Sequence, residues 1–121
     1  MTAEFKAPLD VRFLPECQDP SWILLAPLPF YSVVMGRIVE APEGYITNFV
    51  SFEALKNVGQ RPSTIHDFLY DCEDVPREIA DRVFLEALES VGVNIVLDGA
   101  MWLGVRLGGA SHRTPTRRLD P

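Results

Sequence analysis

The chain has 121 residues, of which 47 % are hydrophobic and 23 % charged, values typical of one globular domain with its own core. Its formal net charge of −6 argues against a general nucleic-acid binder, which needs a cationic face. The two cysteines, Cys17 and Cys72, are too few for a disulfide framework and lack the paired spacing of a metal site. We expect both to be reduced thiols.

The N-terminus has no basic region followed by an apolar run, so we expect no secretory signal. The longest apolar stretch, from Trp22 to Met35, is interrupted by two prolines and is too short to span a bilayer. We therefore expect a protein that is made in the cytoplasm and has no transmembrane segment.

The first half of the chain is rich in β-branched and aromatic residues between prolines and glycines, which is typical of short, irregular strands. Residues 1–20 are expected to form an N-terminal arm and residues 22–52 a β region. Ala41-Pro42-Glu43-Gly44 has turn composition, since proline presets φ and glycine accepts a positive φ. Residues 37–47 are therefore predicted to form a hairpin. The predicted strands are Val11–Leu14, Trp22–Leu25, Phe30–Met35, Arg37–Glu40 and Tyr45–Thr47.

The second half, residues 62–109, is predicted to be helical. A first helix begins at Pro62, which suits a first turn, and runs to about Tyr70. Asp74 is expected to cap a second helix that ends at Gly92. A third helix is expected over residues 97–107. The apolar stripe of the second helix has helical spacing and consists of Ile79, Val83, Phe84, Ala87, Leu88 and Val91.

Residues 110–121 form a basic, proline-containing tail with almost no apolar residues. This composition is typical either of a disordered, solubilising tail or of a tail that docks on a neighbouring subunit. For residues 1–109 we expect a single α+β domain. In it, irregular antiparallel β-hairpins pack on an antiparallel helix pair and on a third, C-terminal helix.

A cluster of residues that can carry chemistry lies on the first two predicted helices. His66 and Tyr70 are four residues apart and share a helix face, whereas Asp67 points about 100° away from His66. A short loop between two antiparallel helices would place His66 opposite Asp81. A buried Asp81 needs a partner, and it would hold one imidazole nitrogen while the other can take a proton from water.

Four motifs occur in order between about residues 37 and 109. They are Gly44-Tyr45-Ile46-Thr47-Asn48, His66-Asp67-x-Leu69-Tyr70, Arg77-x-x-Ala80-Asp81-x-x-Phe84 and Val105-Arg106-Leu107-Gly108. Through these motifs the chain resembles a group of small, uncharacterised proteins encoded by tailed phages and prophages. That group in turn resembles, more distantly, the bacterial secreted calcium-dependent phospholipases of the A(2) kind.

The phospholipase resemblance implies a helical core and a role for each matching residue. His66 is implied to be the general base, Asp81 to orient it, and Tyr70 to brace Asp81. Asp67 is implied to bind Ca²⁺, together with Asn48 and the carbonyl of Phe49. Asn48 stands where the pattern has Asp, which removes one anionic ligand and should lower the calcium affinity.

Two functions from different classes follow. In the first, the chain is a virion-associated structural protein of the tail, baseplate or head–tail region. Its arms dock on other virion proteins in an oligomeric particle, and its His/Asp cluster is a brace or relic. In the second, it is a calcium-dependent ester hydrolase that acts on lipid of the host membrane. Asn48 favours the first. A third interpretation, an intracellular phage protein that counters a host defence, stays open.

Overall fold

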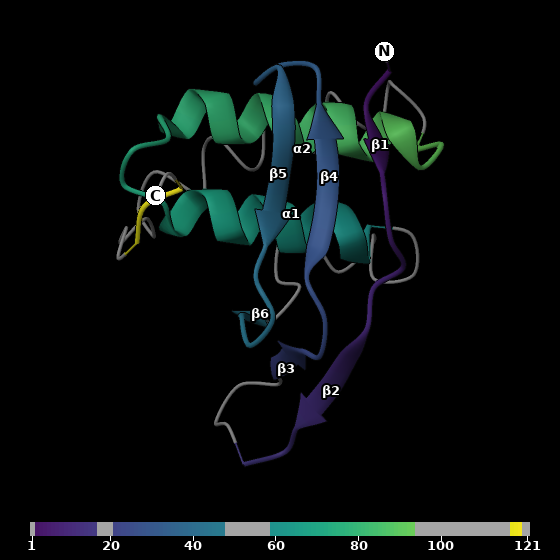
Figure 1. Cartoon of the computed structure of the whole chain (residues 1–121), viewed down its shortest axis with the longest axis vertical. Helices are drawn as coiled ribbons and strands as arrows, with labels where there is room; N and C mark the ends of the chain where they lie inside the picture. The colour runs from purple at the N-terminus through teal and green to yellow at the C-terminus, as the bar shows by residue number, and fades with distance from the viewer. Residues whose placement is uncertain (1, 17–20, 48–58, 94–116, 120–121) are drawn as a thin grey trace.

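The structure, a computed structural model, describes residues 2–16, 21–47, 59–93 and 117–119 (Figure 1). The predicted mixed α+β class is confirmed. The predicted third helix, residues 97–107, lies outside the described residues. Neither of the two described helices is long and apolar enough to cross a membrane. The elements are β1 (Glu4–Phe5), β2 (Val11–Leu14), β3 (Ser21–Leu24), β4 (Leu28–Ser32), β5 (Arg37–Ala41), β6 (Ile46–Thr47), α1 (Gln60–Asp71) and α2 (Arg77–Ser90).

The strands form two three-stranded antiparallel sheets. The strand order is β1-β4-β5 in the first sheet and β2-β3-β6 in the second. Three chain segments pass from one sheet to the other, and each crossing contains a proline, namely Pro8, Pro27 or Pro42. Proline has no N–H to donate to a ladder, so regular pairing is interrupted at these positions. Main-chain bonds continue nearby, since Gly44 N donates to Leu24 O at 2.8 Å.

The predicted hairpin over residues 37–47 is wrong. β5 pairs with β4, with Phe30 opposite Val39, and β6 pairs with β3. Gly44 has a φ of +87°, as predicted for a turn. The turn, however, leads the chain from the first sheet into the second and does not pair β5 with β6. The reversal lies between β4 and β5, where Gly36 adopts φ +66°. The valines at 33 and 34, predicted as strand, occupy this turn because the Glu86 carboxylate accepts from both of their N–H groups, at 3.0 and 3.3 Å.

The hydrophobic core lies between the first sheet and the helix pair, which covers one face of that sheet (Figure 1). β4 alternates as a half-buried strand should, with Leu28 and Phe30 buried and Tyr31 on the opposite face. Phe5 from β1 packs on Phe30 with ring centroids 4.6 Å apart. Each fully buried side chain of this size contributes roughly 1.5–3 kcal/mol. The helices supply Ile65, Phe68, Leu69, Ala80, Val83 and Ala87.

The ends of the helices differ in part from the prediction. α1 begins at Gln60, two residues before Pro62. The proline is tolerated there because the N–H groups of a first helical turn have no partner within the helix. Asp74 does not cap α2, since Pro76 is at the N-cap and makes no side-chain cap bond. The Asp74 carboxylate instead accepts from Leu119 N at 2.7 Å. The predicted end of α2 is confirmed, because Gly92 follows it with φ +86°.

Both terminal regions contribute to this one body. β1 and β2, from the predicted N-terminal arm, pair with β4 and β3 respectively. Residues 117–119, yellow in Figure 1, lie beside the loop that joins α1 to α2. These parts of the predicted arm and tail therefore dock on their own chain.

Candidate functional site

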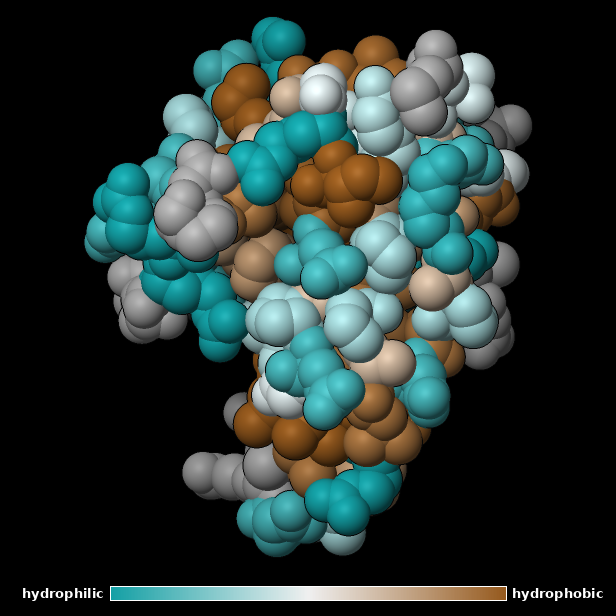
Figure 2. All heavy atoms as spheres, in the orientation of Figure 1, coloured by the Kyte–Doolittle hydropathy of each residue, from teal (hydrophilic) through white to brown (hydrophobic). Residues whose placement is uncertain are grey.

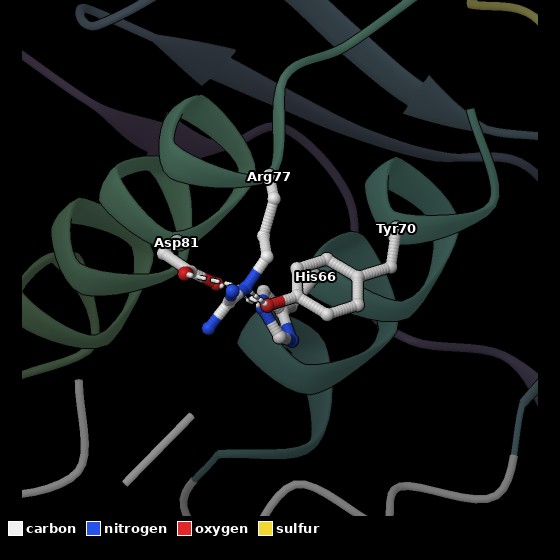
Figure 3. A network of polar contacts seen from close by, with 4 residues as sticks. All are labelled: His66, Tyr70, Arg77 and Asp81. Carbon is white, nitrogen blue, oxygen red and sulfur yellow. Dashed lines mark hydrogen bonds and ion pairs between the residues drawn. The ribbon is translucent and has the colours of Figure 1, made fainter. Parts of the chain in front are cut away.

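The antiparallel helix pair brings His66 of α1 against Asp81 of α2, as the sequence predicted (Figure 3). The imidazole Nε2 lies 2.9 Å from the carboxylate Oδ1. His66 is 4 % exposed and Asp81 is fully buried, so the pair is largely shielded from bulk water. A buried carboxylate is stable only with partners, and the imidazole is the first of them.

Tyr70 and Arg77 also lie against Asp81. Tyr70 lies one turn after His66, and its hydroxyl donates to the same Oδ1 at 2.8 Å. Burial, with the bond to Asp81, raises the pKa of Tyr70 to about 12. Arg77 lies one turn before Asp81, with Nε 3.3 Å from the Tyr70 hydroxyl and 3.9 Å from Asp81 Oδ2. Sequence reasoning did not assign Arg77 to the site, although its spacing from Asp81 is that of a helical ion pair.

The hydrogen bond to Asp81 sets the tautomer of His66. An ionised Asp81 accepts from Nε2–H, so in the neutral ring Nδ1 carries the lone pair. Within the described part of the chain, nothing hydrogen-bonds to Nδ1. The ring is packed between Tyr70 and Phe84, with centroids 4.3 and 4.6 Å away. The arrangement therefore presents one oriented basic nitrogen inside a largely apolar setting.

A second polar cluster lies on the neighbouring face of α1. The Thr47 hydroxyl donates to Asp67 Oδ2 at 2.7 Å, and the Tyr45 hydroxyl donates to Asp71 Oδ2 at 2.9 Å. Tyr45 lies two residues before Thr47 of β6, and Asp67 and Asp71 are four residues apart on one face of α1, so the two bonds join neighbouring positions. Sequence reasoning missed Tyr45, Thr47 and Asp71 as members of a cluster. The signal that could have indicated them is the spacing of two residues between Tyr45 and Thr47 together with the spacing of four residues between Asp67 and Asp71.

Burial dominates the electrostatics of this second cluster. It raises the pKa of Asp67 to about 6, and the bond from Thr47 partly offsets the effect. It also raises the pKa of Tyr45 well above its usual value, with Asp67 and Asp71 adding to the shift. Asp67 is therefore a carboxylate whose charged form is costly in this position.

Comparison with known proteins places the chain in a family. Residues 22–105, more than half of the chain, match the family model described as "Protein of unknown function (DUF1353)". The chain belongs to this family. The matched range contains both polar clusters of α1 and the whole of α2. No curated protein and no solved structure matches the chain.

The predicted calcium ligands of this DUF1353 chain are only partly in view. Asn48 and Phe49 lie outside the described residues. Asp67 is described, and Thr47, which precedes Asn48, is bonded to it. The described residues contain no group of three or more His, Cys, Asp or Glu side chains that could hold a metal ion. Asp67 fits as one ligand, because a carboxylate oxygen suits Ca²⁺ and a nearby cation would favour its charged form.

Proposed function

We propose that this DUF1353 chain is a structural protein of a phage particle, in the tail, baseplate or head–tail region. In this proposal it docks on neighbouring virion proteins, and the His66–Asp81 cluster braces the helix pair. The observation that best supports docking is the exposed apolar surface of the β2-β3-β6 sheet.

This surface follows from the register of the strands. Arg12, Ile23 and Ile46 are direct cross-strand partners and so share one face of the sheet. Ile46 is 51 % exposed, and Leu25, which follows β3, is 48 % exposed. On the other face, Phe13 is 48 % exposed and packs on Trp22, with tilted rings whose centroids are 5.4 Å apart. Figure 2 shows hydrophobic residues gathered at the lower end, where Figure 1 places β2 and β3. Gathered apolar residues of this kind are typical of protein–protein contact sites.

The burial of the His66–Asp81 cluster supports the role as a brace. The Asp81 carboxylate of α2 is fully buried and is bound by two groups of α1, the His66 imidazole and the Tyr70 hydroxyl. A buried polar network of this kind fixes how two helices sit on each other, since sliding one of them would leave a charge without partners. No catalysis is needed to explain it.

The test is the composition of purified particles. Particles from cells that encode the chain should contain it when analysed by mass spectrometry, and particles without it would overturn the proposal. A full-length chain with Leu25→Lys and Ile46→Lys should fold normally yet be lost from particles. Ile38→Lys is the matched control, because Ile38 is 42 % exposed but belongs to the first sheet.

A second candidate is the hydrolysis of phospholipid esters, favoured by His66 Nδ1, to which nothing among the described residues hydrogen-bonds. In this proposal Nδ1 takes a proton from water while the resulting hydroxide attacks the ester carbonyl. Asp81 stabilises the imidazolium, and Tyr70 and Arg77 hold Asp81. The imidazolium then returns the proton to the departing alcohol, which leaves a fatty acid and a lysolipid. Bound Ca²⁺, held by Asp67 with Asn48 and the Phe49 carbonyl, would polarise the ester carbonyl.

The hydrolase has its own test. Mixed bacterial phospholipid vesicles, incubated with the chain at millimolar Ca²⁺, should release fatty acid and lysolipid detectable by mass spectrometry. His66→Ala should abolish the release. Independently of activity, Ca²⁺ should raise the thermal unfolding temperature of the wild type but not of Asp67→Asn. No release from wild-type protein would eliminate this candidate and leave the brace.

A further inference from the structure

The C-terminal segment Arg117–Leu119 binds the α1–α2 loop through its main chain. Arg117 N donates to Asp71 O at 2.8 Å, and Glu73 N donates to Arg117 O at 2.6 Å. The segment thus forms a parallel bridge with Cys72, in the manner of a strand added to a sheet edge. These bonds give affinity that does not depend on the side chains.

The side chains of the same three residues add specificity. The Arg117 guanidinium lies over the rings of Tyr45 and Phe68, 5.2 and 5.8 Å from their centroids. Arg118 pairs with Glu73 at 2.9 Å. Leu119 packs on the edge of the core. Two arginines and a leucine therefore meet two rings, an acidic loop and an apolar surface.

We propose that the α1–α2 loop is a binding site for the Arg117–Leu119 segment of a second copy of this chain. The three consecutive residues Arg117–Leu119 make all the contacts described above, so the same segment of another copy can make them unchanged. The basic segment and the acidic loop, which contains Glu73 and Asp74, are complementary in charge. The loop binds its own tail because tethering raises the local concentration of the segment.

This inference deepens the proposed structural function, since copies crowded in a particle reach concentrations at which tails exchange between neighbours. The exchange would link adjacent copies through the same contacts between segment and loop that each copy makes within itself. The tail exchange depends only on the contacts between the Arg117–Leu119 segment and the loop, so it can be measured with purified protein in the absence of particles.

Two full-length variants test the exchange. The first carries Glu73→Lys and Asp74→Lys, so its loop repels its own intact tail. The second carries Arg117→Glu and Leu119→Asp, so its altered tail leaves its own loop empty. When they are mixed, the intact tail of the first should bind the intact loop of the second. Each variant alone should remain monomeric and show the circular dichroism of the wild type.

The readouts are native mass spectrometry and NMR. The mixture should show a heterodimer, and the Glu73 amide of the second variant, labelled with ¹⁵N, should shift to saturation. No heterodimer and no shift at about 1 mM of each chain, the scale of a short tether's effective concentration, would overturn the inference. A heterodimer from a chain that is absent from purified particles would instead retain the inference and overturn the proposed function.

Discussion

The two polar clusters on α1 both join hydrogen-bond donors to carboxylates, but α1 supplies the donors in one cluster and the carboxylates in the other. On one face, His66 and Tyr70 donate from α1 to a single carboxylate on the partner helix. On the next face, Asp67 and Asp71 are on α1 and accept from hydroxyls at positions 45 and 47. The first carboxylate is fully buried, whereas the two on α1 are only half-buried.

This difference in burial decides what each cluster can do. Asp71 keeps part of its surface exposed, so water can replace a partner that is lost there, and the loss of one bond should cost little. Asp81 is fully buried, so water cannot readily replace a partner that is lost there, and its hydrogen bonds should contribute more to the stability of the helix pair. The four predictions below test this contrast.

Removal of the buried carboxylate should have the largest effect. We expect Asp81→Ala to lower the free energy of unfolding by about 3–5 kcal/mol, because it leaves buried donors without an acceptor. Asp71→Ala, the matched change on the other face, should cost less than about 1.5 kcal/mol. Urea unfolding followed by circular dichroism measures both, and equal losses would show that burial does not separate the clusters.

Loss of one hydroxyl from each cluster gives a finer comparison. Tyr70→Phe removes a donor from the fully buried carboxylate and should cost roughly 1.5–3 kcal/mol. Tyr45→Phe removes a donor from half-buried Asp71, which water can reach, and should cost roughly 0.5–1 kcal/mol. Both variants keep the ring, so packing is matched. The prediction fails if Tyr45→Phe proves the more destabilising change in urea.

The second cluster should be sensitive to pH through Asp67. Burial raises the pKa of Asp67 from an ordinary 3.8 to about 6. Between these values the folded chain holds a proton that the unfolded chain has lost, so stability falls as pH rises from 4 to 6. We expect the fall to be about 1–2 kcal/mol, after allowance for partial exposure.

Asp67→Asn is the control for this pH dependence, because the amide oxygen can still accept from Thr47 and does not titrate. Thermal unfolding at several pH values should show a difference between wild type and variant that grows across this window. Parallel curves would mean that Asp67 keeps its ordinary pKa in the folded chain.

Neutralisation of Arg77 should have the smallest effect. Its side chain is 27 % exposed and its Nε lies 3.9 Å from the carboxylate, so the ion pair is weak. We expect Arg77→Gln to cost less than about 1 kcal/mol in urea unfolding. A loss as large as that of Asp81→Ala would place Arg77 among the indispensable partners of the buried carboxylate.

Local chemistry explains why some elements were predictable. The apolar stripe of α2 and the glycine after it define the helix and its end, because both act over a few residues. The same spacing placed His66 and Asp81 on facing helices. Strand pairing was less predictable, since the valines before Gly36 favour a strand locally. Glu86, from a distant helix, holds them in a turn instead.

The sequence by itself determined the α+β class, the helix pair and the juxtaposition of His66 with Asp81, because each follows from periodicity and a short connection. Only the tertiary structure decided that β6 pairs with β3, that Asp74 receives the tail, and that a second carboxylate cluster faces Tyr45 and Thr47. These contacts join residues about 20 to 45 positions apart. No local pattern encodes them, since they depend on how the packed elements meet around one core.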